Sequence, residues 1–134
     1  MKKLLFLFPL FFIGCTDNAI VQNYHKNLPI DGIKCIKLTV FPPNKYVEQS
    51  FKELYDFDNK CEIELFVEVK GGITCNSNQN IQKKATGSFP SSYLNMQLKT
   101  SKKKLYIYYK DIQGAVEKDD IEDAFSRMRK ELNL

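Results

Sequence analysis

The distribution of apolar residues divides the chain into an apolar start, a polar stretch and a series of short amphipathic segments. Residues 4–13 are apolar without interruption, whereas residues 16–31 are mixed and polar and have no clear period. Beyond residue 32, alternating apolar and polar residues give way at intervals to apolar residues spaced three or four apart. The first of these patterns is typical of strands with one buried face, and the second of helices with one buried face.

Four segments show the alternation expected of strands. In residues 33–41, Ile36, Leu38 and Val40 alternate with polar side chains, and Pro42 ends the segment. In residues 61–69 the side chains predicted to point one way are Cys61, Ile63, Leu65, Val67 and Val69, and those predicted to point the other way are Glu62, Glu64, Phe66 and Glu68. Two more strands are predicted around residues 92–99 and 104–111, with a turn between them. In the last strand Leu105, Ile107 and Tyr109 form the predicted apolar face.

Two further segments have helical periodicity. Asn44 can cap a helix over residues 45–56, in which Val47, Phe51 and Leu54 form one apolar stripe. A second helix is predicted from residue 117 or 118, with acidic residues at its start and basic residues at its end, as the helix dipole favours. The order β-α-β-β-β-α over residues 32–134 predicts one α+β domain: a two-layer sandwich with two helices on one face of a four-stranded mixed sheet.

Composition and charge exclude two broad classes of protein. The chain has 134 residues, 43% of them hydrophobic and 27% charged, which argues against disorder of the whole chain. Its net charge is +4 and includes Lys2 and Lys3, so without them the charge falls to +2. The clustered basic excess that is usual in nucleic-acid-binding proteins is therefore missing, and no nucleic-acid partner is expected.

The first fifteen residues have the layout of a secretory signal. Lys2 and Lys3 precede the ten-residue run LLFLFPLFFI. A membrane-spanning helix needs about 20 apolar residues, so this run is too short to span, and Pro9 would disrupt such a helix. A buried N-terminal helix is the alternative interpretation, but no polar face interrupts the run and a basic pair precedes it. The pattern therefore favours a signal peptide over residues 1–14.

The end of the run, FFIGC, resembles the lipobox of bacterial lipoproteins. Gly14 matches the small residue before the cleavage site, and Cys15 matches the cysteine that carries the lipid. This resemblance implies acylation of Cys15, including palmitate-type chains, and a lipidated tether over residues 15–31. It also implies that Thr16, where an aspartate would favour the inner membrane, directs the protein to the outer membrane. We expect the domain to face the periplasm. Two or more acyl chains give durable anchoring, whereas one gives marginal binding.

The remaining cysteines are Cys35, Cys61 and Cys75. In an oxidising compartment two of them could form a disulfide and leave the third unpaired. The strand pattern places Cys35 and Cys61 on opposite faces, which disfavours that pair, and Cys75 could approach either one. The pairing stays open, as does the alternative of three unpaired thiols. The wide spacings and the single His25 do not match a metal site, and no metal or other cofactor is expected apart from the covalent lipid.

Two surface features could serve binding. Phe66, Tyr93, Tyr106 and Tyr108 are predicted on the sheet face turned away from the helices, where a contiguous aromatic patch would form a contact site for a partner. Cross-strand pairing that only stiffens the sheet is the alternative interpretation. Lys102, Lys103 and Lys104 at a predicted hairpin tip could contact anionic headgroups, although such lysines are often simply solvated.

These features together predict a small envelope lipoprotein that acts as a non-enzymatic interaction or assembly module with a protein partner. The alternative is a lipid- or glycan-binding lipoprotein that uses the aromatic face and the nearby lysines. The chain offers no recognisable catalytic constellation, because its only histidine lies in the predicted tether. The order of elements resembles that of the lipopolysaccharide-assembly lipoproteins, which support an outer-membrane β-barrel. That resemblance covers element order alone and carries over no functional residue.

Overall fold

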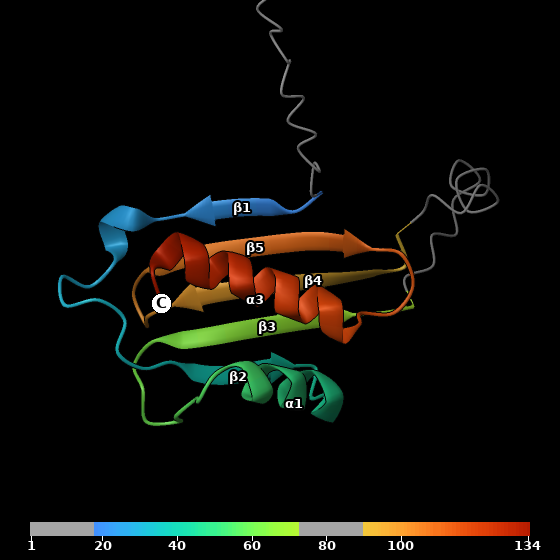
Figure 1. The fold of residues 1–134 in the computed structure, drawn as a ribbon, viewed down its shortest axis with the longest axis horizontal. Helices are drawn as coiled ribbons and strands as arrows, with labels where there is room; N and C mark the ends of the chain where they lie inside the picture. The colour runs from blue at the N-terminus through green and yellow to red at the C-terminus, as the bar shows by residue number, and fades with distance from the viewer. Residues whose placement is uncertain (1–17, 73–89) are drawn as a thin grey trace, which may run out of the picture.

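Two α-helices lie against one face of a five-stranded mixed sheet in the computed structural model, which describes residues 18–72 and 90–134 (Figure 1). The elements are β1 (Ile20–Asn23), the 3-10 helix η1 (His25–Asn27), β2 (Lys37–Phe41), α1 (Lys45–Leu54), β3 (Glu64–Lys70), β4 (Ser92–Lys99), β5 (Lys104–Ile112) and α3 (Lys118–Leu132). The strand order is β1-β5-β4-β3-β2. Strands β2 and β3 are parallel and the other neighbours are antiparallel, which confirms the predicted α+β class, the parallel crossover and the meander.

The sheet has one strand more than the sequence pattern predicts. Residues Ile20–Asn23 lie inside the expected tether, yet they pair with Tyr106–Tyr109 as the edge strand β1. Four residues are too few to show a period, and Val21 is the only apolar side chain of the strand that packs against the core. The backbone ladder to β5 therefore holds this strand, and such a ladder leaves no hydrophobic pattern in the sequence.

Both helices begin at side-chain caps. Asn44 accepts hydrogen bonds from the backbone amides of Tyr46 and Val47 at the start of α1. At the start of α3, Glu117 and Asp120 form a capping box. The helices are linked by an ion pair of 2.6 Å between Lys118 Nζ and Glu53 Oε2. Their mutual hydrogen bond and charge attraction lower the pKa of Glu53 and raise the pKa of Lys118.

The core lies between the two helices and the sheet. Phe51 of α1 meets Phe125 of α3 edge to face, with 6.0 Å between ring centroids, and neither side chain is more than 1% exposed. Apolar side chains of β3 and β4, including Leu65 and Met96, complete the core from the sheet. Burial of this shared apolar surface is what fixes the helices on the sheet.

A bulge in β5 reverses the side-chain pattern predicted for that strand. Leu98 pairs with Tyr106 but Lys99 pairs with Lys104, so Leu105 is an extra residue on β5. Leu105 and Tyr106 are consequently both fully buried, and from there on the alternation is inverted. Tyr106 and Tyr108 face the core, not the open side, which corrects their predicted place on a partner surface.

The disulfide joins Cys35 and Cys61, the pair that the strand pattern disfavoured. The two Cα atoms are 5.7 Å apart. Strand β2 begins only at Lys37 and β3 only at Glu64, so both cysteines lie in the loops before their strands. The argument from opposite faces of a sheet therefore does not apply to them, and the bond joins two loops of the same end of the domain.

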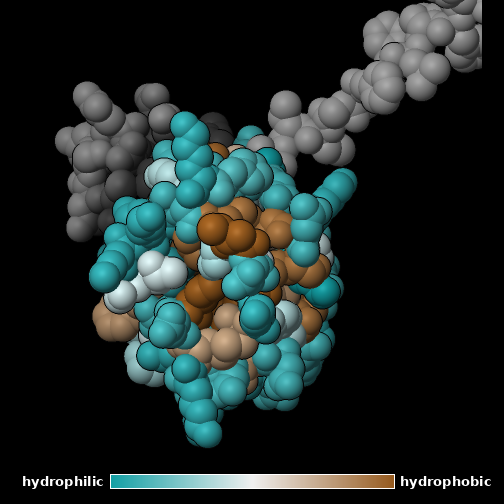
Figure 2. All heavy atoms as spheres, turned by 90° about the vertical axis from the view of Figure 1, so that its left-hand side faces the viewer, coloured by the Kyte–Doolittle hydropathy of each residue, from teal (hydrophilic) through white to brown (hydrophobic). Residues whose placement is uncertain are grey.

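That end is called here the hairpin end, and it consists of residues 24–36, 55–63, 99–104 and 129–134. It is the left-hand side of Figure 1 and is seen face-on in Figure 2. Hydrogen bonds from the Tyr24 amide to the Leu105 carbonyl (3.0 Å) and from Asn27 Nδ2 to the Lys104 carbonyl (2.9 Å) hold η1 against the hairpin. Apolar side chains gather at its centre, and hydrophilic ones surround them (Figure 2).

Candidate functional site

The face of the sheet opposite the helices is the main candidate surface, because none of the elements in residues 18–72 and 90–134 covers it. Strand alternation and register define its members. They are Ile20, Gln22, Lys37, Thr39, Phe41, Glu64, Phe66, Glu68, Lys70, Tyr93, Asn95, Gln97, Lys99, Ile107, Tyr109 and Asp111. This set is called the open face. It carries three lysines and three carboxylates, so its formal charge is balanced.

Aromatic side chains form two stacked pairs on the open face. Phe41 and Phe66 have ring centroids 6.5 Å apart, and Tyr93 and Tyr109 have theirs 5.5 Å apart. Phe41 is 56% exposed, and Ile20 on the other edge strand is 61% exposed. Stacked cross-strand pairs stiffen a sheet, and here they also present apolar area to the outside.

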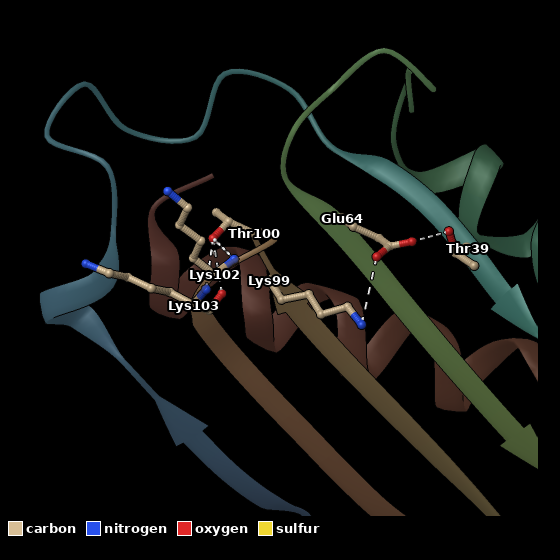
Figure 3. Close-up of polar contacts among 6 residues, drawn as sticks. All are labelled: Thr39, Glu64, Lys99, Thr100, Lys102 and Lys103. Carbon is tan, nitrogen blue, oxygen red and sulfur yellow. Dashed lines mark hydrogen bonds and ion pairs between the residues drawn. The ribbon is translucent and has the colours of Figure 1, made fainter.

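A chain of polar contacts crosses three strands beside the Phe41–Phe66 pair. Glu64 lies between Thr39 and Lys99, as Figure 3 shows. The Thr39 hydroxyl donates to Glu64 Oε1 at 2.5 Å, and Lys99 Nζ lies 3.9 Å from Glu64 Oε2. Lys99 Nζ is also 4.7 Å from the centroid of the Phe66 ring, within range of a cation–π contact. The carboxylate and the amine are therefore engaged in holding the surface together.

The two tyrosines of the open face donate to carboxylates. The Tyr93 hydroxyl donates to Glu68 and the Tyr109 hydroxyl to Asp111, each at 2.9 Å. Partial burial, strengthened by these hydrogen bonds, raises the pKa of Tyr93 and raises the pKa of Tyr109 to about 12. Both phenols are thus neutral donors at physiological pH, and they fix the direction of the rings.

The open face holds only part of the partner surface that the sequence predicts. Phe66 and Tyr93 lie on it as expected, whereas Tyr106 and Tyr108 are 0% exposed. Sequence reasoning missed Ile107, Tyr109 and Phe41, which take their place. For Phe41 a sequence signal was available, because it alternates with Val40 and stands immediately before Pro42. For Tyr109 nothing in the sequence marks the bulge that turns it outward.

The predicted anion-contact lysines lie at the β4–β5 hairpin. Lys102, Lys103 and Lys104 are exposed, and the turn is held by Thr100, whose hydroxyl accepts hydrogen bonds from the backbone amides of Lys102 and Lys103 (Figure 3). None of the three amines forms an ion pair with another described residue. They remain available for an external anion.

Two of the predicted functional cysteines, Cys15 and Cys75, lie outside the described residues. In residues 18–72 and 90–134 no cluster of three or more His, Cys, Asp or Glu side chains could hold a metal ion. Within the same ranges no helix is both long enough and apolar enough to cross a membrane.

A cleft of about 590 Å³ lies at the end of the domain opposite the hairpin end. Its walls come from the start of α1, the end of β3 and the segment before α3, and include Tyr46, Val69 and Val116. The exposed Tyr46 and the capping residues Asn44 and Glu117 stand at its rim. Its volume is in the range of small-molecule sites, and its walls are mostly apolar.

Comparison with known proteins gives no relative for this chain: no protein-family model, no curated protein and no solved structure matches it significantly.

Proposed function

We propose that this chain is a lipid-anchored envelope protein that acts, without catalysis, as an interaction or assembly module through the open face of its sheet. The membrane anchor in this proposal is the lipid on Cys15, in the outer membrane and facing the periplasm. The observation that carries the proposal is the open face itself, with its two aromatic pairs and no covering element among residues 18–72 and 90–134. The Cys35–Cys61 disulfide agrees with an oxidising compartment and gives that location weak support.

The chemistry of the open face suits a protein partner better than a lipid surface. Glu64, Glu68 and Asp111 lie among the aromatic rings, and their burial against acyl chains would be costly. The amide of Gln97 and the paired phenols can instead meet the polar groups of a protein. Tyrosine and phenylalanine are also enriched at protein interfaces.

The footprint of the open face limits the area that a contact can bury, although buried area alone does not fix affinity. Five strands about 4.8 Å apart and about seven residues long give a face of roughly 450 Å². Stable complexes bury about 800 Å² on each partner. The contact is therefore weak or transient for the free domain, and an anchor that concentrates both partners on one membrane would compensate for this.

A second candidate function, binding of a lipid or glycan, is supported by the 590 Å³ cleft beside Tyr46. The two functions use different surfaces of the molecule. Substitutions at Phe66 would affect the first and substitutions at Tyr46 the second.

The anchor is tested by metabolic labelling of cells with a fatty-acid analogue. The wild-type chain is expected to take up label and to fractionate with the outer membrane, because acylation of Cys15 supplies the anchor. Cys15→Ala is expected to lose both properties. Cys75→Ala serves as the matched control and is expected to keep both. Equal labelling and equal fractionation of the wild type and Cys15→Ala would show that the lipoprotein proposal is wrong.

A further inference from the structure

The charge of the domain is divided unequally between its two ends. The hairpin end contains nine basic and five acidic residues, whereas the rest of the described chain contains seven basic and ten acidic residues. The basic residues of the hairpin end are Lys26, Lys34, Lys60, Lys99, Lys102, Lys103, Lys104, Arg129 and Lys130. An overall charge near zero therefore conceals a positive end and a negative remainder, and this polarity orients the molecule in an external field.

Three of these lysines are held close to η1. Lys26 belongs to η1 itself, and the hydrogen bond from Asn27 Nδ2 to the Lys104 carbonyl fixes η1 beside the hairpin that carries Lys102 and Lys103. All four lysines are exposed and form no ion pair with a described residue. Exposed amines without an ion-pair partner can each contact an external anion.

An apolar tip stands next to these lysines. Ile30 is fully exposed, at 104%, in a turn closed by a hydrogen bond of 3.0 Å from the Gly32 amide to the Pro29 carbonyl. Tyr24, which precedes η1, is 36% exposed. Apolar and tyrosine side chains surrounded by lysines are the combination that favours the boundary between lipid headgroups and acyl chains.

The position of β1 determines which part of the domain can approach the membrane. Only five residue steps separate Cys15 from Ile20, and such a link reaches at most about 18 Å. Strand β1 is the outermost strand of the sheet, and the chain passes from it directly into η1 at the hairpin end (Figure 1). Ile20 pairs with Tyr109 and so lies at the end of β1 away from the hairpin end. A domain that lies along the whole of its β1 edge brings η1 and the neighbouring lysines, as well as Ile20, to the surface to which Cys15 is attached.

From this arrangement we infer that the hairpin end docks on the anionic phospholipid headgroups of the membrane that holds the anchor. Lys26, Lys102, Lys103 and Lys104 contact the headgroups, and Ile30 enters the boundary below them. The inference rests on the proposed acylation of Cys15. A lipid chain combined with a basic surface is a two-part membrane attachment, and here the second part also sets the orientation of the domain. In this orientation the β1 edge faces the membrane. The open face stands at a right angle to that edge and stays accessible to a partner.

The test uses a fluorescent reporter at the tip. The chain contains no tryptophan, so Ile30→Trp introduces a single indole. The purified lipidated chain is placed in vesicles of phosphatidylcholine alone or of phosphatidylcholine and phosphatidylglycerol in equal amounts, with brominated acyl chains as quencher. We expect the indole to be quenched at least twofold more in the anionic vesicles and this difference to disappear at high salt. Gln49→Trp, at an exposed position of α1 outside the hairpin end, is the control and should show no dependence on phosphatidylglycerol.

A matched pair of charge variants tests the lysines. Lys102→Gln with Lys103→Gln should weaken the docked state on the order of tenfold, because each lysine near an anionic surface contributes to binding. Lys45→Gln with Lys70→Gln removes the same charge from exposed positions at the opposite end and should have no effect. Circular dichroism confirms that all the variants are folded.

The outcomes separate this inference from the proposed anchor. If the chain floats with both kinds of vesicle but the quenching of Ile30→Trp does not depend on phosphatidylglycerol, the docking inference is wrong and the anchor stands. If Cys15→Ala floats as well as the wild type on phosphatidylcholine alone, the anchor is wrong. In that case the docking inference still holds if the quenching of Ile30→Trp requires phosphatidylglycerol. If a photoreactive group at position 30 crosslinks in cells to an acidic protein without any such quenching, the hairpin end serves a protein and the inference fails.

Discussion

Individual tyrosines of this chain have opposite roles that their sequence context does not reveal. Tyr106 and Tyr108 are core residues, and Tyr109, their neighbour, belongs to the open face. The difference arises from the one extra residue, Leu105, in the β5 ladder. Side chains alternate between the two faces of a strand with a period of two. One extra residue moves every later side chain to the opposite face, and the alternation in the sequence stays the same.

The raised pKa of Tyr109 predicts a specific alkaline instability. The pKa is about 12 in the folded domain and about 10 in an unfolded chain. The folded state therefore favours the neutral phenol. This contribution to stability is complete below pH 10, declines above it and is lost as the pH passes through 12. Over this window we expect the unfolding free energy of Tyr109→Phe to fall less steeply with pH than that of the wild type. The difference in slope corresponds to at most one proton released on unfolding.

Urea unfolding over a series of pH values measures this slope, with any free thiols alkylated beforehand. Asp111→Asn removes the carboxylate to which Tyr109 donates, so it should reduce the slope in the same direction and by less. An unchanged slope in Tyr109→Phe would contradict the attribution of this pH dependence to the raised pKa of Tyr109.

At the scale of elements, the sequence predicted what hydrophobic periodicity determines and missed what backbone pairing determines. The two helices and strands β3 to β5 lie within a few residues of their predicted bounds, because each buries an amphipathic face. Helix α1 ends at Leu54 and not near residue 56. Strand β1 and the Cys35–Cys61 pair depend on contacts between distant segments, and no local signal encodes these.

The disulfide is predicted to stabilise the domain through the loop it closes. The two cysteines are 26 residues apart, and closure of a loop of this length is worth about 3.5 kcal/mol in the chain-entropy model. Cys35→Ser with Cys61→Ser should lower the free energy of unfolding by about this amount, measured by urea denaturation, and a reductant should have the same effect on the wild type. Cys75→Ser is the control and should keep the wild-type stability. Insensitivity of the wild type to reductant would rule out the bond in the mature protein.

Of the candidate site, the sequence correctly placed Phe66 and Tyr93 on the open face and Lys102 to Lys104 at an exposed hairpin. The strand alternation also placed Glu64 and Glu68 beside Phe66. Ile107, Tyr109 and Asp111 could not be predicted, because the bulge in β5 reverses the faces of that strand. The same is true of the charge polarity, since residues 24–36, 55–63 and 129–134 are far apart in the sequence and meet only at the hairpin end.

At the scale of the whole molecule, the proposals assign one task to each surface. The helices cover one face of the sheet and complete the core. The hairpin end faces the membrane, and the open face remains for a protein partner. A face of roughly 450 Å² binds weakly by itself, but confinement to one membrane raises the effective concentration of the partners to the order of millimolar. The contact is therefore expected to form in cells and to be lost when the anchor is removed.

Photocrosslinking in cells tests the central claim, partner binding by the open face, most directly. A photoreactive phenylalanine analogue replaces Phe66 on the open face, and the same analogue at Gln49, an exposed position of α1, is the matched control. We predict a discrete protein adduct from position 66 that is absent from position 49 and much reduced in the Cys15→Ala background. Adducts of equal yield from the two positions, or none from position 66, would contradict the claim.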